Sequence, residues 1–99
     1  MILVFGKTGQ IAIELQRLSD VLALGRDQAD LSDPVACAKK IQDFAPHAVI
    51  NAAAYTEVDK AEANEELATI INGYTPTAIA QACADMKIPL VHISSDYVF

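Results

Sequence analysis

The first residues that could do chemistry are the small residues of a short turn, "FGKTGQIA", whose spacing suits anion binding. Gly6, Gly9 and Ala12 follow a G-x-x-G-x-x-A pattern, which permits a tight turn, close backbone approach and close helix–strand packing. The first amides of a helix after such a turn have no intrahelical partners and suit a pyrophosphate. A plain turn between a strand and a helix is the alternative. Met1 leaves no room for the first glycine of a P-loop, so Lys7 is interpreted as a loop cation near the phosphates.

A second group of polar residues follows the next apolar run, at "GRDQADLSDP". Position 25 is where many dinucleotide-binding proteins carry an acidic residue for the ribose hydroxyls, and here it is Gly25 followed by Arg26. A basic residue at this place accommodates a 2'-phosphate, so Arg26 favours NADP over NAD. A solvated loop arginine is the alternative. The Asp30 carboxylate could accept a hydrogen bond from an adenine amino group, and a surface turn is its alternative.

Two later stretches, "NAAA" and "SSDYVF", complete the candidate chemistry. Three small residues from Ala52 to Ala54 would let a ribose or pyrophosphate pass close to the backbone, or would merely pack under a helix. Ser95 and Asp96 would present a hydroxyl and a carboxylate after a buried strand, unless they only cap a helix. Nothing here forms a nucleophilic triad, because His92 lies on the strand itself.

Hydrophobic patterning predicts the elements that would position these residues. Strands are expected at 1–5, 21–24, 48–54 and 89–95, and helices from Gln10 through Leu18, at 34–44 and at 63–86. Val35, Ala38, Ile41 and Phe44 would share the buried side of the second helix; Asp33 would cap it, and Gly73 and Pro76 would kink or divide the third. The order β-α-β-α-β-α-β predicts an α/β fold with a parallel sheet, whose ligand lies at the carboxyl ends of the strands.

Composition excludes several other classes of protein. The chain has 99 residues, enough for one domain, and its net charge of -6 with seven scattered basic residues disfavours nucleic acid as a partner. No apolar run reaches the roughly 18 residues of a membrane span, and no signal peptide is evident, so a cytoplasmic protein without a membrane partner is predicted. Cys37 and Cys83 have no metal-ligand or redox spacing and are expected to be buried thiols.

Four stretches together, "FGKTGQIAIELQ", "DLSDP", "INAAAYTEVDKAE" and "HISSDYVF", closely resemble the amino-terminal part of the dTDP-4-dehydrorhamnose reductases. These belong to the extended short-chain dehydrogenase/reductase superfamily. The resemblance implies a Rossmann-type NAD(P)-binding domain and reduction of the C4 keto group of a dTDP-sugar substrate, dTDP-4-dehydro-L-rhamnose, by NADPH or NADH. The product, dTDP-L-rhamnose, serves polysaccharide biosynthesis.

The resemblance also implies roles for individual residues. It assigns the pyrophosphate to Gly6, Gly9, Gln10 and Ile11, the adenine region to Asp30 and Leu31, and the ribose side to Ala54, Tyr55 and Thr56. The Ser95 hydroxyl would bond the C4 carbonyl oxygen as the hydride arrives, and Asp96 would contact the sugar nucleotide.

The sequence departs from the family pattern in ways that bear on activity. Family members often have Gly at position 12, and some have an acidic residue at position 25. The Tyr-x-x-x-Lys pair that would donate the proton does not occur in residues 1–99. The chain is therefore expected to form a single, incomplete NAD(P)-binding domain, without the sugar-nucleotide-binding lobe, and to be inactive by itself. The alternative is a non-catalytic dinucleotide-binding or regulatory module. The resemblance leaves Mg²⁺ and a homodimer open for full-length members, and no Mg²⁺ ligand set is evident here.

Overall fold

The fold is a parallel sheet with helices on both faces. The structure, a computed structural model, describes residues 1–7, 10–18, 20–25, 27–52, 66 and 69–93. Four strands, β1 (Ile2–Phe5), β2 (Val21–Leu24), β3 (Ala48–Asn51) and β4 (Leu90–His92), pair in the order β2-β1-β3-β4. Every pairing is parallel. The predicted α/β fold with a parallel sheet is confirmed.

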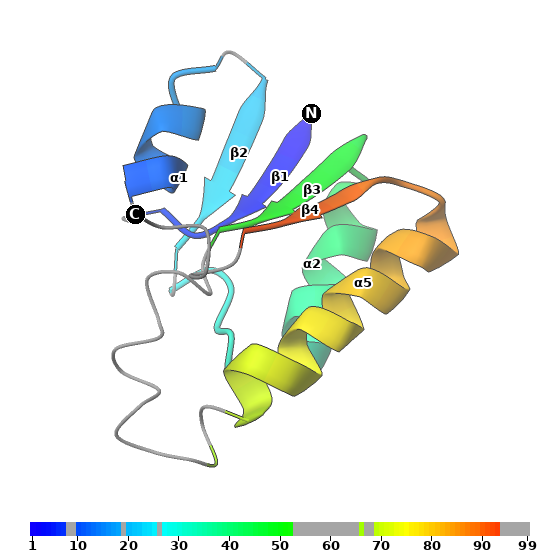
Figure 1. The fold of residues 1–99 in the computed structure, drawn as a ribbon. Coiled ribbons are helices and arrows are strands. Elements are labelled where there is room, and N and C mark those ends of the chain that lie inside the picture. The colour runs from blue at the N-terminus through cyan, green and yellow to red at the C-terminus, as the bar shows by residue number, and fades with distance from the viewer. Residues whose placement is uncertain (8–9, 19, 26, 53–65, 67–68, 94–99) are drawn as a thin grey trace.

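The helices divide between the two faces of this sheet (Figure 1). The short helix α1 (Gln10–Leu15) covers one face, and α2 (Pro34–Phe44) lies beside α5 (Thr75–Met86) on the other. A π-helical turn, η1 (Ile70–Tyr74), leads directly into α5. In the part of the chain that the structure describes, none of the helices has the length and apolar character needed to cross a membrane.

Alternation along the strands fills a core on each face of the sheet. Leu3 and Phe5 point to the α2 and α5 side, whereas Val4 between them points to the α1 side. The larger core also contains Cys37, Ile41, Val49, Ile79 and Cys83, all at most 2% exposed. The smaller core uses alanines, with Ala12, Ala23 and Ala52 around Val4. Both faces of each central strand are thus apolar, as parallel sheets require.

The helices lie where they were predicted, but some differ from the prediction in length and in which residues they bury. α1 ends at Leu15, and Leu18, expected on its buried side, is 56% exposed. On α2, Val35 is 77% and Phe44 40% exposed, while Cys37 is fully buried. The buried positions of α2 are set by its packing against both the sheet and α5, which shifts its inward stripe away from Val35. Near Gly73, where a kink or division is predicted, the structure has the π-helical turn η1, which continues into α5 without a break.

Two strands and one cap complete the comparison with the sequence. β3 ends at Asn51 and β4 spans only three residues, so both are shorter than predicted within the described range. The Asp33 carboxylate accepts a hydrogen bond from the Ala36 amide at 3.1 Å, which confirms the predicted cap of α2.

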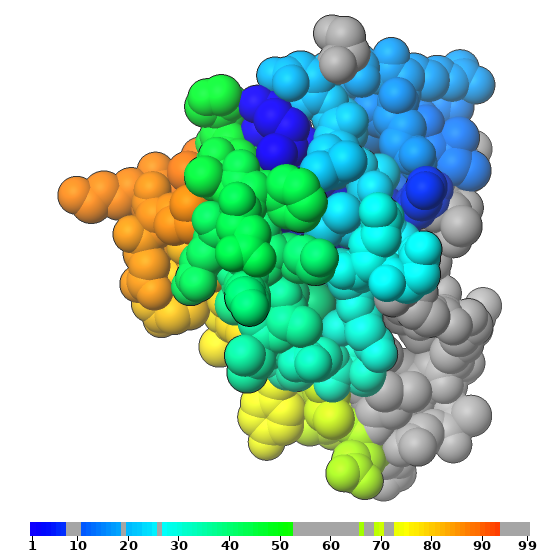
Figure 2. Space-filling model, turned by 180° about the vertical axis from the view of Figure 1, so that it is seen from behind, coloured from blue at the N-terminus to red at the C-terminus, as the bar shows by residue number. Residues whose placement is uncertain are grey.

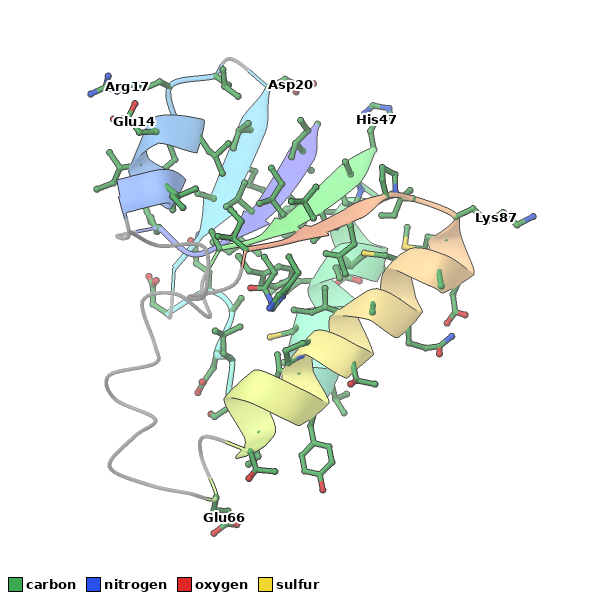
Figure 3. All side chains as sticks on the ribbon, viewed as in Figure 1. Glu14, Arg17, Asp20, His47, Glu66 and Lys87 are labelled. Atoms are coloured by element: carbon green, nitrogen blue, oxygen red, sulfur yellow. The ribbon has the colours of Figure 1, made fainter. Side chains whose placement is uncertain are left out.

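The amino-terminal edge of the sheet is held by charged contacts. The Met1 ammonium lies 3.1 Å from Asp20 Oδ2 and 2.7 Å from His47 Nδ1, and the His47 amide donates to the Met1 carbonyl at 2.8 Å. Figure 3 shows Asp20 and His47 at the same end of the sheet, while Glu14 and Arg17 pair on the outer side of α1. The amino-terminal end of β1 is thereby fixed, and the polar loops at the opposite edge are separate from it.

Candidate functional site

The carboxyl ends of all four strands lie in one row. Phe5 is paired with Leu24 on one side and with Asn51 on the other, and Asn51 is paired with His92. β1 stands between β2 and β3, so the chain leaves β1 toward one side of the sheet and returns on the other side. Ligands of open α/β sheets bind in the crevice at such a switch point. The row therefore defines the candidate site, as the sequence predicted.

The turn after β1 has the backbone geometry that a glycine allows. Gly6 has φ of 119°, a conformation that other residues rarely adopt, and its amide donates to the Leu24 carbonyl at 2.9 Å. Ala12 is 1% exposed and packs with Val4, Ala23 and Ala52. The Ala12 methyl group therefore fits at the third position of the motif, inside a small core whose other buried members are Val4 and two alanines.

The loop after β2 is tied to two helices. The Cys37 thiol donates to the Asp30 carbonyl at 3.3 Å, and the Thr75 hydroxyl donates to the Leu31 carbonyl at 2.6 Å. The Asp30 carboxylate accepts hydrogen bonds from the Ser32 amide at 2.9 Å and from the Ser32 hydroxyl at 2.7 Å. These contacts fix both the backbone and the carboxylate of Asp30 at the edge of the sheet.

Within that loop the two residues assigned to the adenine region differ in exposure. Asp30 is exposed, whereas Leu31 is 6% exposed and belongs to the larger core. The structure thus places the Asp30 side chain at the surface near the end of β2. The Leu31 side chain is in the core, so a ligand would contact the backbone of Leu31 more than its side chain. Ile11 is half-buried on the first turn of α1.

Two polar residues near the site were not singled out by the sequence. Thr75 is fully buried and holds the loop after β2 through a partner 44 positions away, and no local pattern indicates such a bond. Asn51 is 2% exposed, and its Nδ2 lies 3.3 Å from Nδ1 of the exposed His92. A polar residue at the end of the apolar run "AVIN" was the available signal for Asn51.

The two thiols are buried, as predicted, and chemically quiet. Burial, together with the nearby Asp33 and Asp30 carboxylates, raises the pKa of the Cys37 thiol to about 11. Burial also raises the pKa of Cys83. Both thiols stay protonated at neutral pH, which makes them poor nucleophiles and metal ligands. Among the described residues, no group of three or more His, Cys, Asp and Glu side chains could hold a metal ion.

Most residues predicted from the sequence to contact a ligand lie outside the described ranges. They are Gly9, Arg26, Ala54, Tyr55, Thr56, Ser95 and Asp96, and only the backbone of Gln10 is described. Their roles stay predictions. The structure describes the framework around them, which consists of the strand ends, the turn at Gly6 and the loop holding Asp30.

Comparison with known proteins points to reductases of nucleotide sugars. Two proteins named "dTDP-4-dehydrorhamnose reductase", from Escherichia coli and Burkholderia thailandensis, are 41% and 43% identical to the chain over 99% of its length. A solved structure of the Bacillus anthracis reductase in complex with NADP, 33% identical, superposes on 99% of the chain with a TM-score of 0.81.

The match covers this chain completely but its relatives only in part. The chain spans 35% and 34% of those two curated relatives and 37% of the Bacillus anthracis structure. The family described as "RmlD substrate binding domain" matches residues 1–99. A parallel sheet, a glycine turn at its switch point and relatives of one kind lead to one assignment: the chain belongs to the RmlD substrate binding domain family.

Proposed function

We propose that the chain forms the cofactor-binding part of an NADP(H)-dependent reductase acting on the C4 keto group of a dTDP-sugar. The observation that carries the proposal is the match over 99% of the chain to reductases of this kind, one of them in complex with NADP. The substrate proposed is dTDP-4-dehydro-L-rhamnose, and the product dTDP-L-rhamnose. NADPH is proposed as the physiological cofactor, with NADH as a second donor.

The residues at the switch point fit a dinucleotide. Gly6 at φ of 119° carries no side chain toward the turn, Gly25 carries none at the end of β2, and Ala52 leaves only a methyl group at the end of β3. Small residues therefore stand at three neighbouring strand ends, which suits the close approach of a pyrophosphate and its riboses. The bound nicotinamide would supply the hydride for carbonyl reduction.

The residues of this chain would bind and orient the reactants. Gly6, Gly9, Gln10 and Ile11 would hold the pyrophosphate, and Asp30 and Leu31 the adenine region. Arg26 would lie near the adenosine ribose, and Ala54, Tyr55 and Thr56 on the ribose side. The Ser95 hydroxyl would donate to the C4 carbonyl oxygen, and Asp96 would contact the sugar nucleotide. The proton that completes the alcohol would come from the family's tyrosine, which residues 1–99 do not contain.

Cofactor binding is tested directly on the chain. NADPH and NADH are titrated into it while nicotinamide fluorescence is followed, with Gly9→Asp as the control that places a carboxylate at the phosphate turn. We expect saturable binding that the Gly9→Asp variant loses while its far-ultraviolet circular dichroism is unchanged. A folded chain that binds neither nucleotide would overturn the proposal.

The reduction is tested in a chimera in which residues 1–99 replace the matching third of the Escherichia coli relative. We expect oxidation of NADPH that depends on the dTDP-sugar, and a fall in kcat of about 10²-fold for Ser95→Ala, because one donor to the developing oxyanion is lost. A chimera that binds NADPH without any turnover would favour the regulatory alternative over the reductase.

A further inference from the structure

A lysine from the turn after β1 lies beside the end of β2. Lys7, in the turn after β1, extends its side chain toward Gly25, the first residue after β2. A Cβ built on Gly25 would stand 3.4 Å from Lys7 Cδ and 3.5 Å from Lys7 Cβ, both ordinary contact distances. In Figure 2 part of the dark-blue segment 1–7 reaches the surface beside the cyan residues that follow β2.

The backbone of this lysine is held in place by α1. The Gln16 side-chain amide donates to the Lys7 carbonyl at 2.8 Å and to the Ala12 carbonyl at 3.0 Å. One side chain thereby joins the turn after β1 to the helix that follows it. The stem of Lys7 starts from a fixed point, and only its outer part is free to move.

Lys7 forms no ion pair within the described residues, although the Asp27 carboxylate, like the Lys7 stem, lies close to Gly25. The Lys7 side chain is exposed, and in the described portion of the chain no carboxylate lies within ion-pair distance of its ammonium group. A Cβ at position 25 would make ordinary contact with the Lys7 stem and would stand only 3.0 Å from an Asp27 carboxylate oxygen, so the tight contact would be with Asp27.

We infer that Lys7 is a ligand of the 2'-phosphate of NADP(H) and thereby sets the preference for NADPH over NADH. The inference rests on the proposed function, which places a dinucleotide at this edge. In dinucleotide-binding sheets the end of the second strand faces the adenosine ribose, where an acidic side chain selects NAD and a basic one accepts the phosphate. In this chain the basic side chain near that position is Lys7, which comes from the turn after β1 and lies beside Gly25.

The test compares the two nucleotides in variants of Lys7. Lys7→Met keeps the apolar stem and removes the charge, and Lys7→Arg keeps a charge that can bond phosphate. We expect Lys7→Met to raise the Kd for NADPH about tenfold, as the loss of a charge-assisted hydrogen bond does, and to change the Kd for NADH less than about twofold. Lys7→Arg should retain the preference for NADPH, and the salt dependence of NADPH binding should weaken only in Lys7→Met.

The matched control is Lys39→Met, which removes another exposed lysine, from α2 on the far side of the sheet from the turn. It should leave both constants unchanged. An equal loss of NADPH and NADH binding in Lys7→Met would place the lysine on the pyrophosphate and overturn the inference, as would no change in either constant. If both nucleotides bind and Lys7→Met does not change the preference for NADPH, the proposed function stands and this inference alone fails. If the unchanged chain binds neither nucleotide, both fail.

Discussion

At the scale of single residues, the buried threonine Thr75 does most to fix the candidate site. Its hydroxyl donates to the Leu31 carbonyl at 2.6 Å, and both residues are nearly inaccessible to water. The Cys37 thiol donates a second hydrogen bond, to the Asp30 carbonyl, and the two bonds together tie the loop after β2 to α2 and α5. The position of Asp30 therefore depends on a residue far from it in the sequence.

Replacing Thr75 by valine should measure the strength of this tie. Valine has the same shape but no donor, so the buried Leu31 carbonyl loses its partner and the free energy of unfolding should fall by about 1–3 kcal/mol. Thr75→Ser keeps the donor and loses one methyl group, with an expected cost of about 1 kcal/mol. Urea unfolding followed by circular dichroism compares the two. A valine variant as stable as the serine variant would contradict the role given to the hydrogen bond.

At the scale of elements, the π-helical turn η1 marks where the last helix adapts to its neighbours. Pro76 has no amide hydrogen to continue the helical bonding, and the Thr77 hydroxyl donates to the Gly73 carbonyl at 2.8 Å. A Cβ on Gly73 would meet nothing within 4 Å. Gly73 is thus required neither by packing nor by its backbone angle, in contrast to Gly6.

These two glycines make a matched pair for alanine substitution. Gly73→Ala should raise the free energy of unfolding by about 0.5–1 kcal/mol, because alanine restricts the unfolded chain and fits the helix. Gly6→Ala should lower it by about 1–3 kcal/mol, because alanine is strained at φ of 119°. Thermal unfolding of each variant, compared with the unchanged chain, measures whether the free energy of unfolding rises or falls. A stabilising Gly6→Ala would contradict the described turn.

The elements also show how far the sequence could be followed. Short apolar runs placed all four strands, and helical spacing with caps placed the helices between them, because these are local signals. Helical spacing put Val35 on the buried side of α2, where the structure buries Cys37, because a helix that contacts both a sheet and another helix turns its inward stripe by an amount that no local pattern records.

The candidate site was foreseeable to a similar degree. The turn at Gly6, the loop at Asp30 and the row of strand ends were predicted, because each follows directly from a strand boundary. The bond from Thr75 to Leu31 and the reach of Lys7 toward Gly25 were not, because each depends on how separate elements pack in three dimensions.

At the scale of the whole molecule, the sheet is unevenly covered. α2 and α5 bury the larger core, whereas on the α1 side the isoleucines Ile2, Ile50 and Ile93 are only partly buried around the smaller core. Among the described strands β4 stands at one edge, where Val91 is 54% exposed. An apolar side chain on an open strand edge favours pairing with another chain.

Replacing Val91 by lysine should therefore reduce self-association of the chain. A charged side chain on the edge strand opposes strand addition, while a position already exposed should change the free energy of unfolding by less than about 0.5 kcal/mol. Light scattering across a concentration series measures the effect. Val35→Lys, which removes an exposed valine from α2, is the control and should change association less. Equal effects of the two variants would attribute association to general surface hydrophobicity.

The loop after β2 has a consequence for the thermodynamics of recognition. It is held by the Cys37 thiol, the Thr75 hydroxyl and the capped start of α2, none of which needs a ligand to be present. A nucleotide that contacts residues 30–33 would meet a segment whose backbone is already held, so little conformational entropy is lost in that segment. Selection between nucleotides there would be a matter of charge and hydrogen bonding, with no contribution from folding of this segment.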